Sequence, residues 1–300
     1  MDVPCSLTAL LLHAIPVDLP ERGRTTIWEA AGPPGAPTLV LLHGVALTAV
    51  LNWSGVVPLL ARDYRVLVFD QRGHGDGLAC STFRLEDCAD DVAAIAAELG
   101  VERLTAVGYS MGGLVAQLLW RRHPQLTAGL VLCATPRNAA GSPWERAVAL
   151  AMPGLVTAAT LVPAVQAMRA DIVGAALLDH DTDSADRSWA IQQMRRTALI
   201  DALSAVQAVC AFTSHAWIGS VDVPTAVVVT RDDRVVPARR QHKLVRAVPQ
   251  TTVIEIDGGH DVFMKEPGRF AAAVQAACDA VHAPRPQPRP RPAPDGEARA

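Results

Sequence analysis

Three polar residues that are far apart in the sequence have the types that nucleophilic catalysis needs: Ser110, Asp233 and His260. A serine hydroxyl is a weak nucleophile at neutral pH, so a base must take its proton during attack and return it to the leaving group. A histidine can be this base, and a carboxylate can hold the imidazole in the right tautomer and stabilise its cation. These residue types predict acyl transfer through an acyl-enzyme, provided that folding brings the three side chains together.

Ser110 lies in a Gly-x-Ser-x-Gly-Gly turn between an apolar strand and an apolar helix. Gly108 and Gly112 lack the Cβ atoms that would collide where strand and helix come close. The helix that begins at Met111 points its free amides and its positive dipole end at any negative charge that forms beside the serine. This turn resembles the nucleophile elbow of the α/β-hydrolase family.

The resemblance extends to two further motifs and covers about residues 14–282, apart from the segment between 137 and 218. His43 and Gly44 match the pair that opens the oxyanion loop in this family. The resemblance therefore implies an oxyanion hole made of the backbone N–H groups of Val45 and Met111. The resemblance also predicts a structural role for His43 and for the Asp-x-Arg-Gly-x-Gly turn at 70–75, which would stabilise the loops of the site.

Two adjacent aspartates compete for the third catalytic position. The family pattern is an aspartate, two or three further residues and then a proline, and Asp233, with three residues before Pro237, fits it better than Asp232 does. Asp257 and Asp261 are weaker rivals, because they are too close in sequence to the histidine to brace its far nitrogen. The chain order Ser, Asp, His is also the order of the α/β-hydrolases.

Alternating apolar strands and amphipathic helices supply the frame for these residues. Strands are predicted at Ala14–Leu19, Arg24–Ala30, Thr38–Leu42, Tyr64–Phe69, Leu104–Val107, Gly129–Ala134, Pro224–Thr230 and Thr252–Ile256, and helices at Trp53–Ala61, Leu85–Leu99, Leu114–Arg122 and Phe270–Val281. The first two strands form an antiparallel edge hairpin, and the later order implies right-handed crossovers. The fold class is α/β, a mostly parallel, doubly wound sheet of the α/β-hydrolase type. Each candidate catalytic residue follows the carboxyl end of a strand, so all three converge on one edge.

The strand pattern stops after Pro136 and resumes near residue 219. The prediction is a core at 1–136 and 219–283, with residues 1–12 as a loose arm, and an inserted helical cap at 137–218. Residues 284–300 are rich in proline and arginine and are predicted to be a disordered, solvated tail rather than an SH3 ligand.

The cap contains an uncharged run at residues 147–168, long enough to span a bilayer. Pro153, Gly154 and Pro163 interrupt the run, so it predicts an apolar roof over an apolar pocket, with lipid contact but no membrane span. The acidic cluster at 179–183 lacks the glycine and the glutamate of a calcium loop. It is predicted to cap the next helix, at 185–197.

Composition excludes several classes. The chain of 300 residues has a net charge of −3 and no block of like charge, so no nucleic-acid partner is expected. The six cysteines have no metal-type spacing and indicate buried thiols in a reducing cytoplasm, and the first 15 residues lack the features of a standard export signal. No metal, nucleotide or flavin motif is present, so no cofactor is expected. The sequence does not specify an oligomeric state.

The resemblance implies a serine hydrolase that cleaves a carboxylic ester of an apolar acid, with a small apolar ester as its substrate. A serine nucleophile argues against the haloalkane dehalogenase and epoxide hydrolase branches, which place an aspartate there. Carbon–carbon bond hydrolases, lactonases, cofactor-free haloperoxidase-like enzymes and acyltransferases use the same residues, because a fold does not decide the reaction. A ligand-binding, receptor-like protein with little turnover is the alternative of another class. The physiological substrate and its acyl length stay open.

Overall fold

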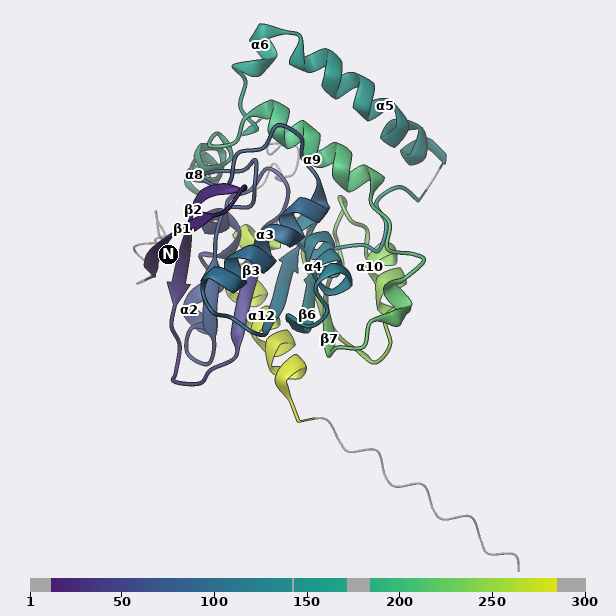
Figure 1. Cartoon of the computed structure of the whole chain (residues 1–300). Coiled ribbons are helices and arrows are strands. Elements are labelled where there is room, and N and C mark those ends of the chain that lie inside the picture. The colour runs from purple at the N-terminus through teal and green to yellow at the C-terminus, as the bar shows by residue number, and fades with distance from the viewer. Residues whose placement is uncertain (1–11, 142, 172–183, 285–300) are drawn as a thin grey trace, which may run out of the picture.

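The computed structural model describes residues 12–141, 143–171 and 184–284, which form one sheet with helices on both faces (Figure 1). The strands are β1 His13–Leu19, β2 Gly23–Ala30, β3 Thr38–Leu42, β4 Arg65–Val68, β5 Leu104–Tyr109, β6 Thr127–Cys133, β7 Thr225–Thr230 and β8 Thr251–Ile256. Their order across the sheet is β1-β2-β4-β3-β5-β6-β7-β8. β1 and β2 pair antiparallel, β2 meets β4 antiparallel, and all later pairs are parallel. The predicted mostly parallel sheet with an edge hairpin is confirmed.

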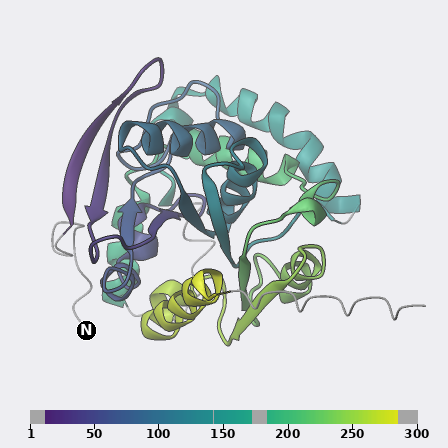
Figure 2. The ribbon, with the colours of Figure 1, turned by 60° about the horizontal axis from the view of Figure 1, so that its bottom comes forward.

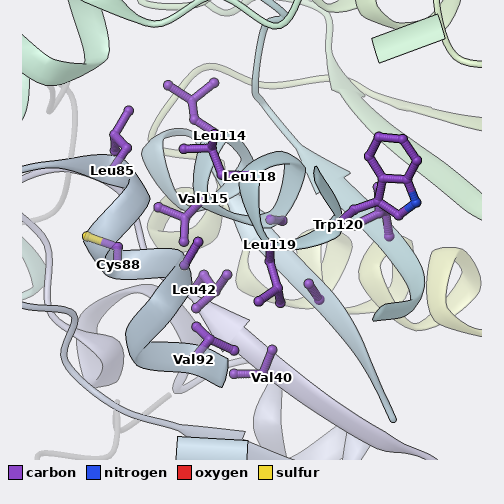
Figure 3. Close-up of a cluster of buried hydrophobic side chains, with 14 of the residues drawn as sticks. Val40, Leu42, Leu85, Cys88, Val92, Leu114, Val115, Leu118, Leu119 and Trp120 are labelled. Atoms are coloured by element: carbon purple, nitrogen blue, oxygen red, sulfur yellow. The ribbon is translucent and has the colours of Figure 1, made fainter. Parts of the chain in front are cut away.

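The core lies in two layers, because successive residues of a buried strand point to opposite faces. The helices of the core region are α1 Ala49–Trp53, α2 Val57–Leu60, α3 Leu85–Glu98, α4 Met111–Arg122, α10 Ala238–Val245, α11 Val262–Lys265 and α12 Pro267–His282. On β3, Val40 and Leu42 pack against α3 and α4, as Figure 3 shows. Leu39 and Leu41 pack in the opposite layer, which contains residues of α1, α2 and α12. Figure 2 shows α12, in yellow, on the far side of the sheet from α3 and α4.

A group of helices enters between β6 and β7, and these are called the cap helices below: α5 Pro143–Thr160, α6 Pro163–Gln166, α8 Ser184–Met194 and α9 Leu199–Ala211. A short 3₁₀ helix, Ile218–Ser220, leads back to the sheet. α5 and α6 contact α9 and lie outside it in Figure 1. Within the described part of 137–218 the β pairing is limited to two isolated bridges.

One predicted helix is wrong. Instead of a single helix over residues 53–61, the chain forms two short ones, α1 and α2. The hydroxyl oxygen of Thr48 accepts a hydrogen bond of 3.3 Å from the N–H of Leu51, so the first helix begins several residues earlier than predicted. Ser54 and Gly55 then separate the two helices, as expected from the low helix propensity of glycine.

Several predictions lie outside the described residues: residues 1–11 of the arm predicted at 1–12, the acidic cluster at 179–183 and residues 285–300 of the tail predicted at 284–300. Leu12, the last residue of the predicted arm, is described and is buried in the core. The uncharged run at residues 147–168 falls largely on α5 and α6, which are described. No described helix combines the length and the apolar character that crossing a bilayer requires.

Candidate active site

Ser110 occupies a strained turn between β5 and α4. Its φ of 52° and ψ of −114° lie in a region that residues with a Cβ rarely adopt. A Cβ on Gly108 would lie 2.3 Å from the carbonyl oxygen of Gly112, so the chain can turn this tightly only with glycine there. Thr135 lies in the segment directly after β6, and its hydroxyl donates to the Ser110 carbonyl at 2.8 Å, which holds the turn in place.

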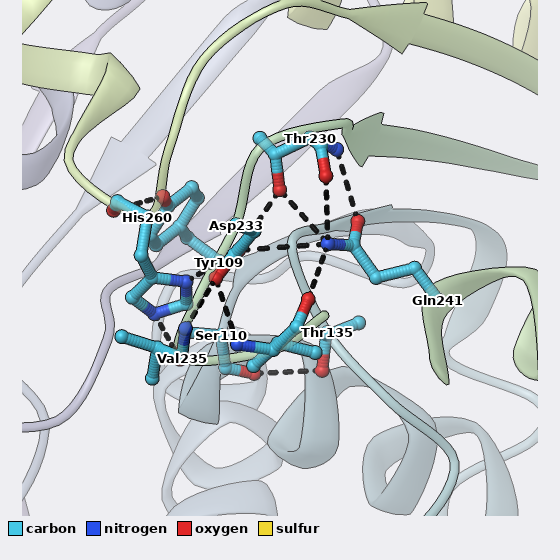
Figure 4. Close-up of polar contacts among 9 residues, drawn as sticks. Tyr109, Ser110, Thr135, Thr230, Asp233, Val235, Gln241 and His260 are labelled. Carbon is cyan, nitrogen blue, oxygen red and sulfur yellow. Dashed lines mark hydrogen bonds and ion pairs between the residues drawn. The ribbon is translucent and has the colours of Figure 1, made fainter. Parts of the chain in front are cut away.

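The three predicted side chains meet in one hydrogen-bonded line (Figure 4). His260 Nε2 lies 2.9 Å from Ser110 Oγ, and His260 Nδ1 lies 2.7 Å from Asp233 Oδ2. Ser110 follows β5, Asp233 follows β7 and His260 follows β8, so the parallel sheet brings their loops to one edge. All three residues are buried, with exposures of 9% or less.

The structure separates Asp233 from its three rivals. Asp232 accepts a hydrogen bond from the Gly258 N–H at 3.2 Å. Asp257 pairs with Arg231, and Asp261 lies 3.5 Å from the Lys265 ammonium. Asp233 is the aspartate whose carboxylate contacts the imidazole.

Backbone and side-chain donors surround the Asp233 carboxylate. Its Oδ1 accepts from the N–H groups of Val235 and Val236, at 2.8 and 2.7 Å, and its Oδ2 accepts from the Thr230 hydroxyl at 2.9 Å. Donors of this kind stabilise the ionised form of a buried carboxylate. With both oxygens held, the carboxylate has one orientation toward His260.

Gln241, on α10, is a buried residue that sequence reasoning missed. Its amide nitrogen donates to the Thr230 hydroxyl at 2.8 Å and to the Val236 carbonyl at 2.7 Å, while its oxygen accepts from the Thr230 N–H at 3.1 Å. Gln241 thereby fixes both ends of the loop that carries Asp233. A glutamine on a charged helix, Ala238–Val245, gives no sequence signal of burial.

Tyr109 was also missed, although it precedes the serine directly. Its hydroxyl donates to the His260 backbone carbonyl at 2.5 Å, and its ring lies 5.3 Å from the imidazole. Burial raises the pKa of Tyr109 well above its usual value, so the hydroxyl stays a donor. This bond connects the serine turn to the loop after β8 without passing through Asp233.

The loop after β3 has a fixed histidine at its base. The backbone N–H of Gln71 donates to His43 Nε2 at 2.9 Å, so the proton is on Nδ1, which faces the Gly44 carbonyl at 2.8 Å. Burial lowers the pKa of His43 to about 4, so the ring is neutral at pH 7. The Gly44 N–H is bound by Asn52, and Val45 follows on the same loop. His43 therefore braces the loop, as predicted.

The Asp-x-Arg-Gly-x-Gly turn also has the predicted bracing role. Asp70 accepts hydrogen bonds from the backbone N–H groups of Ala49 and Asp76, at 2.7 and 2.9 Å. Arg72 binds Asp91 with two hydrogen bonds of 2.6 Å. These contacts join the turn to α1 and α3, beneath the site.

The space directly over Ser110 is small and apolar. Its described lining consists of Gly44, Val45, Leu47, Ser110, Met194, His260 and Phe263. Its volume is about 10 Å³, close to the least that holds one water molecule. Met194 is the lining residue that comes from the cap helices, and it is fully buried.

In the described part of the chain, no cluster of three or more histidine, cysteine, aspartate or glutamate side chains has a metal-binding arrangement. None of the five described cysteines forms a disulfide. Cys88, Cys133 and Cys278 are buried, as predicted, whereas Cys80 and Cys210 are half-buried, so the prediction of buried thiols is wrong for these two.

Comparison with known proteins agrees with this geometry. The family model of the alpha/beta hydrolase fold matches residues 37–267. The chain belongs to the α/β-hydrolase family. This α/β-hydrolase is 29% identical over 232 residues to the "Putative carbamate hydrolase RutD" of Stutzerimonas stutzeri, covering 76% of this chain and 86% of the relative. It is 39% identical over 118 residues to the pimeloyl-[acyl-carrier protein] methyl ester esterase of Sodalis glossinidius, covering 39% of this chain and 44% of that enzyme.

Among solved structures, a thermophilic esterase from Thermogutta terrifontis superposes on this α/β-hydrolase with a TM-score of 0.70 at 22% identity, over 90% of this chain and 100% of the esterase. This likeness concerns the fold. The family match and the named relatives identify the protein as an enzyme of the hydrolase class.

Proposed function

We propose that this α/β-hydrolase cleaves carboxylic esters of apolar acids through an acyl-enzyme, with Ser110, His260 and Asp233 as the catalytic residues. The observation that carries the proposal is the line of two short hydrogen bonds from Ser110 Oγ through the imidazole to Asp233. The apolar lining of the space over the serine supports an apolar acyl group.

In this mechanism the Ser110 oxygen attacks the ester carbonyl carbon while His260 Nε2 takes the hydroxyl proton. The carbonyl oxygen becomes an oxyanion, which the N–H groups of Val45 and Met111 bind; one such donor typically contributes about 3–4 kcal/mol in the transition state. His260 then gives the proton to the departing alcohol. A water molecule repeats the sequence on the acyl-enzyme, and the acid and free serine result.

The supporting evidence for the oxyanion donors is their position. Met111 is the first residue of α4, whose N-terminal amides and positive dipole end lie beside Ser110. Val45 lines the same space, and the neighbouring amide of Gly44 is already bound by Asn52. We therefore propose that two backbone N–H groups bind the oxyanion, one from the loop after β3 and one from the first turn of α4.

The test uses p-nitrophenyl esters and a fluorophosphonate probe on the purified chain. Ser110→Ala should abolish labelling and lower kcat by at least about 10⁴-fold while the circular dichroism spectrum is unchanged. Ser220→Ala, at an exposed serine whose hydroxyl bonds Trp217, is the matched control and should keep both activities. Ester hydrolysis by Ser110→Ala at near the original rate would refute the assignment.

Carbamate hydrolysis is a second candidate, because the relative that spans most of the chain is named as a putative carbamate hydrolase. The same nucleophile would attack a carbamate carbonyl. Turnover of a p-nitrophenyl carbamate well above turnover of the matched ester would favour this candidate. Tight ligand binding without turnover of esters, carbamates, lactones or carbon–carbon substrates would instead favour the receptor-like alternative.

We also propose the division into a core, 1–136 and 219–283, and a cap, 137–218. The order of elements supports it, because the described part of 137–218 consists of helices inserted between two adjacent strands. The buried, unbridged thiols support a cytoplasmic location.

The outer face of the cap supports the proposed lipid contact. Leu150 and Leu161, on and just after α5, are 83% and 78% exposed, in the uncharged run 147–168. Arg146 and Arg169 flank the run and are exposed, which suits the anionic headgroups of a bilayer surface.

Flotation with phosphatidylglycerol vesicles tests this contact. The unmodified chain should float with the vesicles, and the double variant Leu150→Glu, Leu161→Glu should not. Concentration-dependent dimerisation without flotation would show that a second copy, rather than lipid, covers this face.

A further inference from the structure

The cap meets the nucleophile at one described side chain, Met194, the last residue of α8. It is fully buried and lines the space over Ser110, whereas the other described lining residues come from core loops and from α11. Methionine is unbranched, and its three side-chain torsions let it change shape without backbone movement. The size of the space over the serine therefore depends on how this side chain lies.

The backbone around Met194 is attached to the core on both sides. Gln193 Oε1 accepts a hydrogen bond of 3.3 Å from the Thr48 hydroxyl. Three residues after Met194, the Thr197 hydroxyl accepts one of 3.1 Å from the Gly75 N–H. Both core partners are in braced loops near the site. A bulkier substrate must therefore displace the methionine side chain first, because moving the helix end would break these bonds.

The acyl group is the part of an ester that must fit this space. After the first step it stays bound to the serine oxygen while the alcohol departs, so it occupies the volume next to Ser110. That volume is about 10 Å³, roughly one water molecule. A space of this size accepts about one methyl group, as in acetyl, and every added methylene demands a larger displacement of Met194.

We infer that Met194 sets the upper limit of acyl length and that the substrates are esters of short-chain acids, of about two to four carbons, whatever the size of the alcohol. This inference rests on the proposed serine-hydrolase function. It adds the acyl length, which no sequence motif encodes. Met194 acts by excluding volume and takes no part in the proton transfers.

The experiment compares kcat/KM along p-nitrophenyl acetate, butyrate, hexanoate and octanoate, so that the leaving group stays constant. The unmodified enzyme should prefer acetate or butyrate. Met194→Ala should raise the octanoate-to-acetate ratio of kcat/KM by about tenfold or more, since one or more methylene contacts typically change such ratios by this amount. Met194→Val, which removes less volume, should raise the ratio less and keeps the test valid if the alanine variant unfolds.

Met168→Ala is the matched control, because Met168 is a cap methionine that is 37% exposed. Its acyl profile should equal that of the unmodified enzyme. A preference of the unmodified enzyme for octanoate, or an unchanged profile in folded Met194 variants, would overturn the inference. Absence of both ester turnover and fluorophosphonate labelling in the unmodified chain would instead refute the proposed function, so the two failures are distinguishable.

Discussion

Tyr109 offers the sharpest test of how the site is held together. The residue is fully buried, and its hydroxyl donates to the His260 carbonyl at 2.5 Å, while its ring packs against Phe263 and Phe270. Tyr109→Phe removes one oxygen atom and keeps the ring. The change isolates the hydrogen bond that positions the loop of His260, the proposed general base.

The magnitude follows from the loss of this buried bond. Removing the donor from a buried carbonyl costs about 1–3 kcal/mol of the free energy of unfolding. In a chain of this size such a loss lowers Tm by about 2–5 °C. The His260 loop is released on one side, and misplacement of a catalytic group by about 1 Å can reduce the rate by about 100-fold. Because Asp233 still holds the ring, we expect a smaller fall in kcat, of about tenfold, with KM nearly unchanged.

The chain supplies an ideal control in Tyr64, its other tyrosine. Tyr64 is 5% exposed and donates to the Asp279 carboxylate at 2.7 Å, which joins the start of β4 to α12. Tyr64→Phe should lower Tm by a similar amount and leave kcat unchanged. The assays are thermal unfolding, p-nitrophenyl ester kinetics and the rate of fluorophosphonate labelling. A Tyr109→Phe enzyme with kcat within about twofold of the original, or an equal loss of kcat in Tyr64→Phe, would refute the positioning role.

Two further predictions concern stability. Gly113→Ala should lower the free energy of unfolding by about 1–3 kcal/mol, because the added Cβ would lie 2.5 Å from Thr135 Cγ2. Gly154→Ala should raise it by up to about 1 kcal/mol, because a Cβ at this position in α5 meets open space. Thermal unfolding of both variants measures the contrast. Burial lowers the pKa of His43 to about 4. Burial, together with the neighbouring His43, lowers the pKa of His74 to about 3. As the pH falls below about 6.5, both imidazoles therefore take up protons in the unfolded chain before they do so in the folded protein. The contribution of these two histidines to the free energy of unfolding is complete above about pH 6.5 and declines as the pH falls, by about 2 kcal/mol per histidine at pH 5. Urea unfolding at pH 7 and at pH 5 measures this difference, and equal free energies at the two pH values would contradict it.

Much of the fold was predictable because strand periodicity and glycine placement are local signals. Thr38–Leu42 was predicted as the strand that the structure has, since a continuous apolar run suits a strand buried on both faces. The helix predicted over 53–61 failed, because the cap formed by Thr48 depends on a side-chain contact that hydrophobic periodicity does not report.

The sequence by itself pointed to Ser110, Asp233 and His260 as the candidate catalytic residues, because each residue has a distinctive type just after a recognisable strand. Only the tertiary structure decided that Tyr109 and Gln241 hold the loops of His260 and Asp233, and that Met194 lines the space over the serine. These contacts join residues distant in the chain, and their partners are chosen by packing in three dimensions, which leaves no periodic or spacing signal along the sequence.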